Sequence, residues 1–109
     1  MKLVYICSPY RAEDAETVQR NIEYAKELTR TVLMNGDCPV TPHLYMTMCL
    51  DDSIEEERVI GMEAGMELLR RCNRVVVGTK YGISAGMAAE IQCAKDGGMR
   101  IEYKEMAWR

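Results

Sequence analysis

The stretch RVVVGTKYGISAGMAAEIQCAK, residues 74–95, decides the fold that this sequence predicts. It opens on an apolar run rich in β-branched residues, which predicts a strand. It continues through small residues into a helix that begins at Ser84 and extends to about Lys95, before the stop at Gly97 and Gly98. A strand that passes directly into a helix indicates a parallel sheet covered by helices.

Three further strands are expected outward from this stretch. KLVYIC, residues 2–7, is an apolar run that predicts a first strand buried on both faces. CPVTPH, residues 38–43, predicts a short second strand that ends at Pro42, and MRIEYK, residues 99–104, predicts a last strand. The tail of residues 105–109 receives no assignment.

Two more helices are expected between these strands. Apolar residues at three- and four-residue steps predict an amphipathic helix from Asp14, its N-cap, to a stop at Asn35. Ser53 is expected to cap a second helix that extends to about Cys72. The segment LYMTMCLDDS, residues 44–53, fits either a short helix or an ordered loop.

Strands that alternate with helices over 109 residues predict one α/β domain that spans residues 1–109. We expect a Rossmann-like or flavodoxin-like three-layer sandwich with a mainly parallel sheet of four to five strands. Ligands bind such sheets outside the carboxyl ends of the strands. Three clusters follow strands and converge there, namely SPYR (residues 8–11), PHLY (residues 42–45) and TKYGISAG (residues 79–86).

Composition excludes several classes of function. The formal net charge is −3 and no basic stripe is present, which argues against binding of a nucleic acid polymer. No segment approaches the ~20 apolar residues of a membrane span, and the N-terminal apolar run is too short for a signal peptide, so a cytoplasmic protein is expected. Five cysteines without a CxxC pair indicate reduced thiols rather than zinc or disulfides, and no metal or organic cofactor is indicated.

The helix start at Ser84 carries the strongest local signal for a site. Ser84 at the N-cap leaves backbone N–H groups without partners, and Gly82 and Gly86 let a ligand approach them closely. Glu90 lies at the edge of the apolar stripe of this helix, where an unpaired carboxylate needs a partner or a function. The alternative is that Ser84 only caps the helix and Glu90 pairs with a lysine or an arginine.

These motifs carry a resemblance to a known family. YICSPYR at the start, a following helix, and then RVVVG and ISAGMAAEIQCA resemble the nucleoside 2-deoxyribosyltransferase-like superfamily. The chain is also similar to the 2′-deoxynucleoside 5′-phosphate N-hydrolases of that superfamily, and most of all to its small, often phage-encoded members of unassigned activity. The resemblance covers nearly the whole chain in the order of elements.

The resemblance implies roles for individual residues. Glu90 matches the glutamate that attacks C1′ of the deoxyribose and forms a glycosyl-enzyme. Ser84 matches the serine that holds a 5′-phosphate, and Arg11 would be a further phosphate contact. Tyr5 matches a tyrosine near the sugar or the nucleophile, although a tyrosine on the first strand fits the core equally well.

The sequence departs from the family at two positions. The family carries an aspartate on the helix before the third strand, where it binds the sugar and assists protonation of the base. In this sequence the corresponding position is Gly65 or Met66. Both lie on an apolar arc of the helix with Val59, Met62 and Leu69. The acidic residue usual at the end of the third strand is also missing, because Lys80 and Tyr81 follow that strand. Loss of general acid assistance costs about 10²–10⁴-fold in rate.

Other polar residues have both functional and structural interpretations. His43, the only histidine, contacts a base, donates a proton, or is structural. Asn21 bonds a nearby loop or orients the SPYR loop, which includes Ser8, around a ligand. Tyr10 either stacks on the base of a ligand or only packs against neighbouring side chains. Tyr45 has the same two interpretations, and Asp51 and Asp52 cap a turn or supply the missing acid, from this subunit or a neighbour.

Two hypotheses for function follow. The first is an N-glycosidase or deoxyribosyltransferase that acts on a nucleoside or its 5′-monophosphate through Glu90. The alternative is a non-catalytic protein that binds a nucleotide-derived ligand in the same pocket, as a sensor or a sequestering protein. A purely structural domain is disfavoured by the three converging loops. A homo-oligomer is expected, with LYMTMCL as a plausible contact surface.

Overall fold

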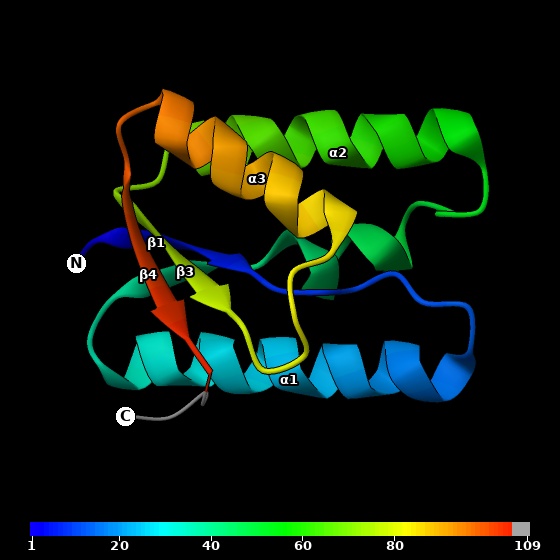
Figure 1. The fold of residues 1–109 in the computed structure, drawn as a ribbon, viewed down its shortest axis with the longest axis horizontal. Coiled ribbons are helices and arrows are strands. Elements are labelled where there is room, and N and C mark those ends of the chain that lie inside the picture. Colours follow the sequence, from blue (N-terminus) through cyan, green and yellow to red (C-terminus); the bar gives the residue numbers. More distant parts are fainter. Residues whose placement is uncertain (106–109) are drawn as a thin grey trace.

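The computed structural model describes residues 1–105 of the chain, and residues 106–109 of the unassigned tail lie outside the described residues (Figure 1). The elements follow the order β1, α1, β2, two short 3₁₀ turns, α2, β3, α3 and β4. The strands are β1 (Leu3–Cys7), β2 (Cys38–Val40), β3 (Arg74–Gly78) and β4 (Arg100–Lys104). The helices are α1 (Ala15–Met34), α2 (Glu55–Arg70) and α3 (Ala85–Asp96), and the 3₁₀ turns span Pro42–Leu44 and Met46–Met48.

The four strands form one parallel sheet in the order β2-β1-β3-β4. The two central strands are in register with Tyr5 beside Val75, and Val75 lies beside Ile101 of β4. The predicted α/β class with a parallel sheet of four to five strands is therefore confirmed, with four strands among the described residues.

Helix α1 covers one face of the sheet, and α2 and α3 cover the other (Figure 1). Successive side chains of a strand point to opposite faces, and β1 is apolar on both. Val4 and Ile6 pack with Tyr24 and Leu28 of α1 in one core cluster. Tyr5 and Cys7 pack in the other, with Val75, Val77, Leu69, Met87 and Ile91. The side chains at odd positions of β1 therefore face α2 and α3.

The chain leaves β1 and β3 toward opposite faces of the sheet. The segment after β1 leads to α1, whereas the segment after β3 leads to α3 on the other face (Figure 1). Because β1 and β3 are neighbours, the two connections diverge at their carboxyl ends and leave a crevice there. This topology places the SPYR and TKYGISAG clusters on either side of one opening.

Two of the three predicted helix caps are confirmed. Asp14 caps α1 by accepting a hydrogen bond from the Thr17 backbone N–H at 2.8 Å, and the Ser84 hydroxyl accepts one from the Met87 backbone N–H at 3.2 Å. The cap at Ser53 is wrong: Ile54 occupies the N-cap of α2 without a side-chain hydrogen bond. The Ser53 hydroxyl donates instead to the Asp51 carboxylate at 2.6 Å, because a charged acceptor lies two residues away.

The segment between β2 and α2 differs from its prediction at one point. Strand β2 ends at Val40 rather than at Pro42, because Pro42 begins a 3₁₀ turn and has no N–H with which to extend the strand. The ambiguous segment of residues 44–53 contains the second 3₁₀ turn and a loop. Within residues 1–105, no helix combines the length and the apolar character that are needed to cross a membrane.

Helix α2 is packed over only part of its length. Gly65 and Leu69 are its buried residues, whereas Val59 and Met62, expected on the same apolar arc, are exposed. The amino-terminal half of α2 extends beyond the carboxyl ends of the strands (Figure 1). It therefore forms a roof over the crevice rather than a layer on the sheet.

Candidate active site

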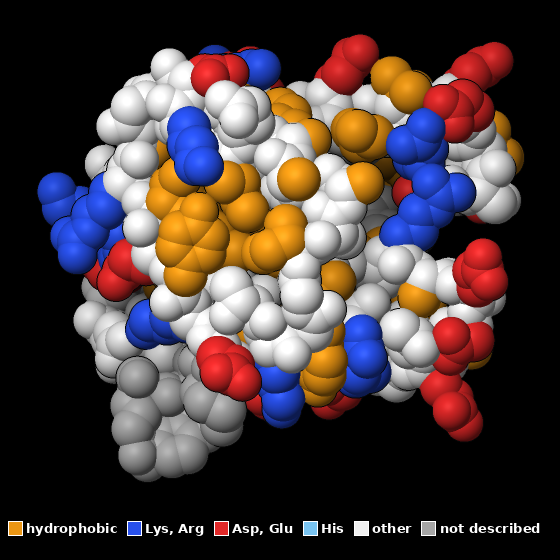
Figure 2. Space-filling view, viewed as in Figure 1, with side chains coloured by type: hydrophobic (Ala, Val, Ile, Leu, Met, Phe, Trp, Pro, Cys, Tyr) orange, Lys and Arg blue, Asp and Glu red, His pale blue; other side chains and the backbone are white. Residues whose placement is uncertain are grey.

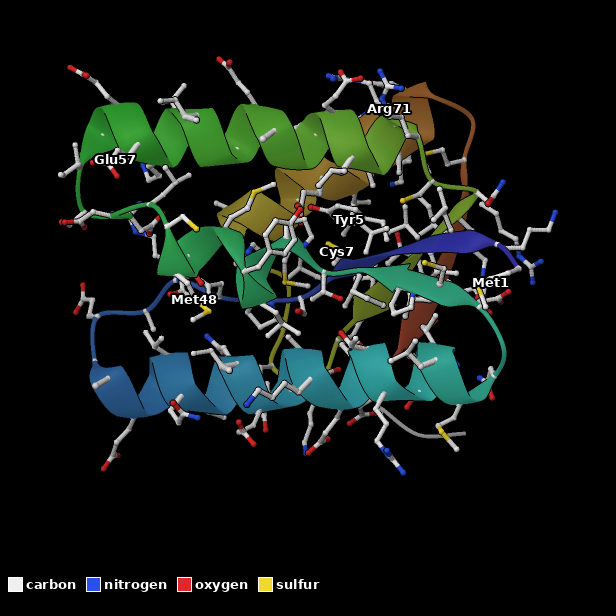
Figure 3. The ribbon with its side chains drawn as sticks, turned by 180° about the vertical axis from the view of Figure 1, so that it is seen from behind. Met1, Tyr5, Cys7, Met48, Glu57 and Arg71 are labelled. Atoms are coloured by element: carbon white, nitrogen blue, oxygen red, sulfur yellow. The ribbon has the colours of Figure 1, made fainter. Side chains whose placement is uncertain are left out.

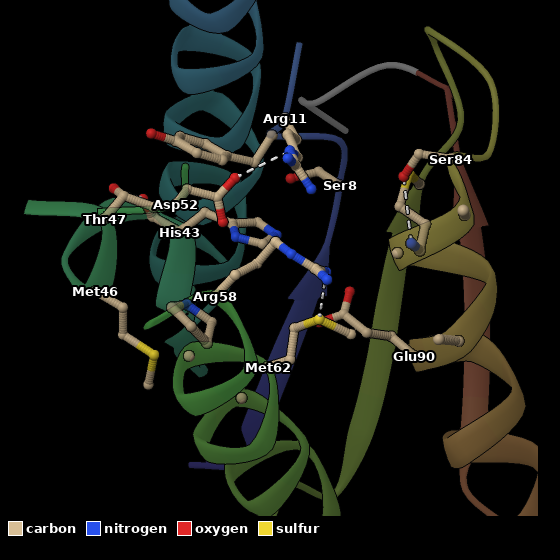
Figure 4. A pocket seen from close by; sticks show the side chains of 18 of the residues that line it. Ser8, Arg11, His43, Met46, Thr47, Asp52, Arg58, Met62, Ser84 and Glu90 are labelled. Atoms are coloured by element: carbon tan, nitrogen blue, oxygen red, sulfur yellow. Dashed lines mark hydrogen bonds and ion pairs between the residues drawn. The ribbon is translucent and has the colours of Figure 1, made fainter. Parts of the chain in front are cut away.

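A cavity of about 800 Å³ occupies the crevice at the carboxyl ends of β1 and β3 (Figure 4). The 3₁₀ turns, α2 and the start of α3 complete its walls. In the space-filling view the molecule is notched at the same end, on the right, between its α2 and α1 halves (Figure 2). The volume lies within the usual range for small-molecule sites.

Most of the residues that the sequence predicts for a site line this cavity. They are Tyr5, Ser8, Tyr10, Arg11, His43, Ser84, Gly86 and Glu90. Gly82 and Asn21 lie outside its lining. Gly82 has a φ of 86°, which L side chains rarely adopt, so its glycine character serves the turn before α3. Asn21 is buried, and its Nδ2 donates to the Tyr10 carbonyl at 3.0 Å, which ties α1 to the SPYR loop.

Glu90 lies on α3 with a side chain that points into the cavity (Figure 4). Met87, Ile91 and Ala94 form the predicted core stripe beside it, and Glu90 itself is only 9% exposed. Its carboxylate accepts a hydrogen bond from the Tyr5 hydroxyl and also contacts the thiol of Cys7. No salt bridge to Glu90 forms within residues 1–105, so the interpretation in which it pairs with a lysine or an arginine is not supported.

Burial controls the ionisation of this group. Desolvation raises the pKa of Glu90, and the hydrogen bond from Tyr5, together with the nearby Cys7 thiol, opposes that rise only in part. Burial, together with the charge of Glu90, raises the pKa of Tyr5 far above its ordinary value, so Tyr5 remains a proton donor. Glu90 is thus a buried carboxylate held by neutral donors.

Two serine hydroxyl groups line the cavity, one from the segment after β1 and one from the start of α3 (Figure 4). The Ser84 hydroxyl is used as the cap of α3, which leaves the first backbone N–H groups of the helix directed outward. A methyl group built at Gly86 would meet nothing within 4 Å, so the space above this helix start is open. The Ser8 hydroxyl is buried and has no hydrogen-bond partner within the described residues. Such a group requires a partner, which a polar ligand could supply.

An aromatic pair forms another wall of the cavity. The rings of Tyr10 and His43 are stacked, with centroids 5.5 Å apart and planes 18° apart. Burial lowers the pKa of His43, against an opposing effect of Asp52, so the imidazole is neutral at neutral pH. A flat, uncharged ring pair is suited to stacking on another planar ring.

Charged side chains gather at the mouth of the cavity, and the sequence analysis did not predict that they lie together. Arg11 forms an ion pair with Asp52 at 3.2 Å, which links the SPYR loop to the segment before α2. Arg58 also lines the cavity, and its guanidinium contacts Glu55 and the sulfur of Met62. Arg58 precedes Gly65 by seven residues, which is two helical turns. This spacing alone could have predicted that Arg58 and Gly65 lie on the same face of α2.

No carboxylate occupies the position at which the resembled family has its aspartate. Gly65 and Met66 both line the cavity, and a methyl group built at Gly65 would lie 3.5 Å from the Tyr5 hydroxyl. A carboxylate at this position would therefore reach the Tyr5–Glu90 pair. The other acidic residues of the lining are Glu13, Asp52 and Glu57, of which Asp52 is engaged by Arg11.

Comparisons with known proteins place the chain among its relatives. No curated protein matches it. One solved structure with the same fold is a 2-deoxyribosyltransferase from the psychrotolerant bacterium Bacillus psychrosaccharolyticus, a biocatalyst for nucleoside synthesis. That structure matches with a TM-score of 0.74 and 13% identity over 93% of this chain and 70% of the other. A family model described as Domain of unknown function (DUF7768) matches residues 2–104, and the chain therefore belongs to this family.

Proposed function

We propose that this protein is an N-glycosidase or deoxyribosyltransferase that acts on a nucleoside or a nucleoside 5′-monophosphate, with Glu90 as its nucleophile. The observation that carries the proposal is the Glu90 carboxylate itself. It is buried, opens onto a cavity, receives a hydrogen bond from Tyr5, and forms no salt bridge within residues 1–105. Buried carboxylates without a cation are costly, and they concentrate at functional sites.

The chemistry follows from this arrangement. A Glu90 oxygen attacks C1′ of the sugar, and the bond between C1′ and the base nitrogen breaks. The base leaves with the electron pair of that bond and takes up one proton from solvent, while the sugar forms an ester with Glu90. Water then attacks C1′, releases one proton to solvent and regenerates the carboxylate. In a transfer reaction a second base attacks instead and loses the proton on its attacking nitrogen. Tyr5 orients the attacking carboxylate throughout.

The rest of the lining supports a nucleotide of this kind. The open start of α3, with Ser84 and Gly86, suits an anionic group such as a 5′-phosphate. Arg11 across the opening offers a guanidinium to the same ligand. The unpartnered hydroxyl of Ser8 suits a sugar hydroxyl or a phosphate oxygen, and the Tyr10–His43 wall suits the planar base.

One observation favours a second candidate, a protein that binds such a nucleotide without cleaving it. Gly65 leaves no carboxylate beside the Tyr5–Glu90 pair to assist departure of the base. Without a general acid the bond to the base is broken slowly. The same cavity would then serve a sensor or a sequestering protein for a nucleotide-derived ligand.

The test is a paired assay of cleavage and binding. Purified wild-type protein and the Glu90→Gln variant are incubated with deoxynucleosides, their 5′-monophosphates and the matching ribonucleotides. Free base is followed by chromatography, and binding is followed by calorimetry. We expect free base from wild type, at least 10³-fold less from Glu90→Gln, and similar binding by both.

The control is Glu63→Gln, which makes the same chemical change on the exposed surface of α2. This variant should keep the wild-type rate. Equal release of base by wild type and Glu90→Gln would overturn the assignment of the nucleophile. Tight binding with the ligand recovered intact would establish the second candidate instead.

A further inference from the structure

Among the described residues, Arg58 is the one cation that α2 contributes to the lining of the cavity. It lies in the first turn of the helix, beside Glu57, which Figure 3 shows at the outer end of α2, whereas Tyr5 lies below the middle of the helix. The Arg58 side chain is only 26% exposed, and it extends from α2 toward Met62 (Figure 4). The outer end of α2 therefore directs a guanidinium back along the cavity instead of into solvent.

Glu55 fixes the orientation of this guanidinium. Its carboxylate accepts hydrogen bonds from Nη2 at 2.6 Å and from Nε at 3.1 Å, and Glu55 itself is not part of the cavity lining. The remaining nitrogen, Nη1, donates to the sulfur of Met62 at 3.2 Å, and Met62 lines the cavity. A thioether is a weak acceptor. An oxygen or nitrogen acceptor of a ligand would therefore replace the sulfur at little cost.

This guanidinium does not serve the Glu90 carboxylate. No salt bridge joins Arg58 to Glu90 within residues 1–105. Burial raises the pKa of Glu90, and only Tyr5 and Cys7 oppose that rise. A cation that lines the cavity without stabilising the buried carboxylate is available to a ligand.

The spacing along α2 leaves room for a planar ring between the guanidinium and the Tyr5–Glu90 pair. Gly65 marks the position of that pair on the helix, because a methyl group built there would lie 3.5 Å from the Tyr5 hydroxyl. Met62, where Nη1 ends, precedes Gly65 by three residues, which is about 5 Å along the helix axis. A base whose sugar carbon lies at Glu90 would therefore present its far edge to Arg58.

We propose that Arg58 binds the base of the nucleotide and stabilises the negative charge that this base acquires as it leaves, an inference that rests on the function proposed above. As C1′ bonds to the Glu90 oxygen, the bond from C1′ to the base nitrogen breaks and its electron pair stays on the base. A fixed cation at the far edge of the base favours this anion over the neutral, bound base. Arg58 keeps its own protons, and the base takes its proton from solvent. This stabilisation takes the place of an acid, which Gly65 does not supply.

The hydrogen-bonding groups of Arg58 select the class of base. A guanidinium has only donors, and it matches the adjacent O6 and N7 acceptors of a 6-oxopurine. Adenine instead presents an amino group, which is itself a donor, beside N7. The fused rings of a purine also reach further from the sugar than a single pyrimidine ring does. We therefore expect guanine and hypoxanthine nucleotides to be the preferred substrates.

The test compares deoxyguanosine 5′-monophosphate with its N7-methylated form on the same protein sample. N7-methylation places a positive charge on the base, so this base leaves as a neutral molecule and needs no cation beside it. Arg58→Met should lower kcat/KM for the unmethylated nucleotide by about 100-fold and should not lower it for the methylated one. Because both rates come from one sample, partial unfolding of the variant would lower them equally and cannot produce this difference.

Two further variants serve as controls. Arg58→Lys keeps the charge but loses the planar fork, so it should lose only about tenfold on the unmethylated nucleotide. Arg70→Met removes a cation from the same helix that also pairs with a glutamate three residues earlier, Glu67. Arg70 is 60% exposed and lies outside the cavity lining, so this variant should keep the wild-type ratio of the two rates.

An equal loss on the methylated and the unmethylated nucleotide would overturn the proposed role of Arg58, as would a wild-type protein that cleaves the adenine nucleotide as fast as the guanine nucleotide. Failure of the proposed function gives a different result, in which no nucleotide releases free base. Calorimetry then decides the contact with the base. Wild type should bind guanine and hypoxanthine nucleotides about tenfold or more tightly than adenine nucleotides, and Arg58→Met should lose this preference. Equal affinities in wild type, or a preference that persists in Arg58→Met, would overturn the contact.

Discussion

The hydroxyl of Tyr5 on β1 donates a hydrogen bond to the carboxylate of Glu90 on α3, across 85 positions of the sequence. This contact joins one of the two central strands of the sheet to the helix whose start lines the cavity. The donor is neutral, and burial of the carboxylate is the larger influence, so the pKa of Glu90 remains raised. The ionised form that nucleophilic attack requires is therefore destabilised in the folded protein.

The first prediction concerns how stability depends on pH. Below the ordinary glutamate pKa of 4.5, Glu90 is protonated in both the folded and the unfolded states. In that range it does not make the free energy of unfolding depend on pH. As pH rises above that value the unfolded state ionises first, so the wild-type protein loses stability until the folded carboxyl also ionises. Glu90→Gln removes this loss, so its stability relative to wild type should increase as pH rises above 4.5.

Urea unfolding of both proteins at several pH values measures this difference. Glu63→Gln is again the matched control, because the Glu63 side chain is exposed. A stability difference between Glu90→Gln and wild type that stays constant from pH 4 to pH 8, within about 0.3 kcal/mol, would show that burial does not control this carboxyl.

The second prediction separates the positioning role of Tyr5 from its packing. Tyr5→Phe keeps the buried ring but removes the donor, so the pKa of Glu90 should rise further. Turnover should fall by about 10- to 100-fold at pH 6 and by less at pH 8, because a hydrogen bond to a charged group is worth about 1.5–3 kcal/mol. The pH profile of kcat/KM checks this result.

Tyr24→Phe provides the control for that profile. Tyr24 also has a buried ring with a bonded hydroxyl, but its hydroxyl donates to the Glu105 carbonyl on the α1 side of the sheet. This variant should lose stability without moving the pH profile. An identical shift in both variants would assign the effect of Tyr5→Phe to general loosening of the core.

The third prediction concerns the link between α1 and the SPYR loop. Asn21 is 2% exposed and donates to the Tyr10 carbonyl, so Asn21→Ala leaves a partly buried carbonyl without its donor. We expect a loss of about 1–3 kcal/mol in the free energy of unfolding, together with weaker ligand binding because Tyr10 and Arg11 lose their support. Gln19→Ala, which removes an exposed amide from the same helix, should change stability by less than about 0.5 kcal/mol. Equal effects of the two substitutions would refute the role of Asn21.

Local signals in the sequence were sufficient to predict where two helices begin and which face of α3 is buried. The caps at Asp14 and Ser84 and the stripe of Met87, Ile91 and Ala94 depend on residues within one or two turns of each other. Burial of Glu90 followed from its place beside that stripe, although its partner Tyr5 came only from the resemblance.

Features that depend on where the sheet ends could not be predicted in the same way. The sequence shows that Val59 and Met62 share an apolar arc with Leu69, but it does not show that the first half of α2 extends past the strands and leaves Val59 and Met62 exposed. The pair of Arg11 and Asp52 joins two loops, and no local pattern reports such a contact. Ser53 does not cap α2, because its hydroxyl donates to the Asp51 carboxylate two residues away.

The last prediction tests how closely α1 packs on the sheet. Gly78 ends β3, and a methyl group built there would lie 2.6 Å from Leu28 Cδ1 and 2.7 Å from the Tyr24 hydroxyl. Both distances are shorter than real contacts, so in Gly78→Ala the side chains of Leu28 and Tyr24 must shift, which strains the hydrogen bonds of Tyr24. We expect a loss of about 1–3 kcal/mol in the free energy of unfolding, measured with urea. Gly86→Ala adds the same methyl group where nothing lies within 4 Å, inside the first turn of α3, and should gain up to about 1 kcal/mol. If Gly78→Ala were as stable as wild type, the close contact of α1 with the end of β3 would be refuted.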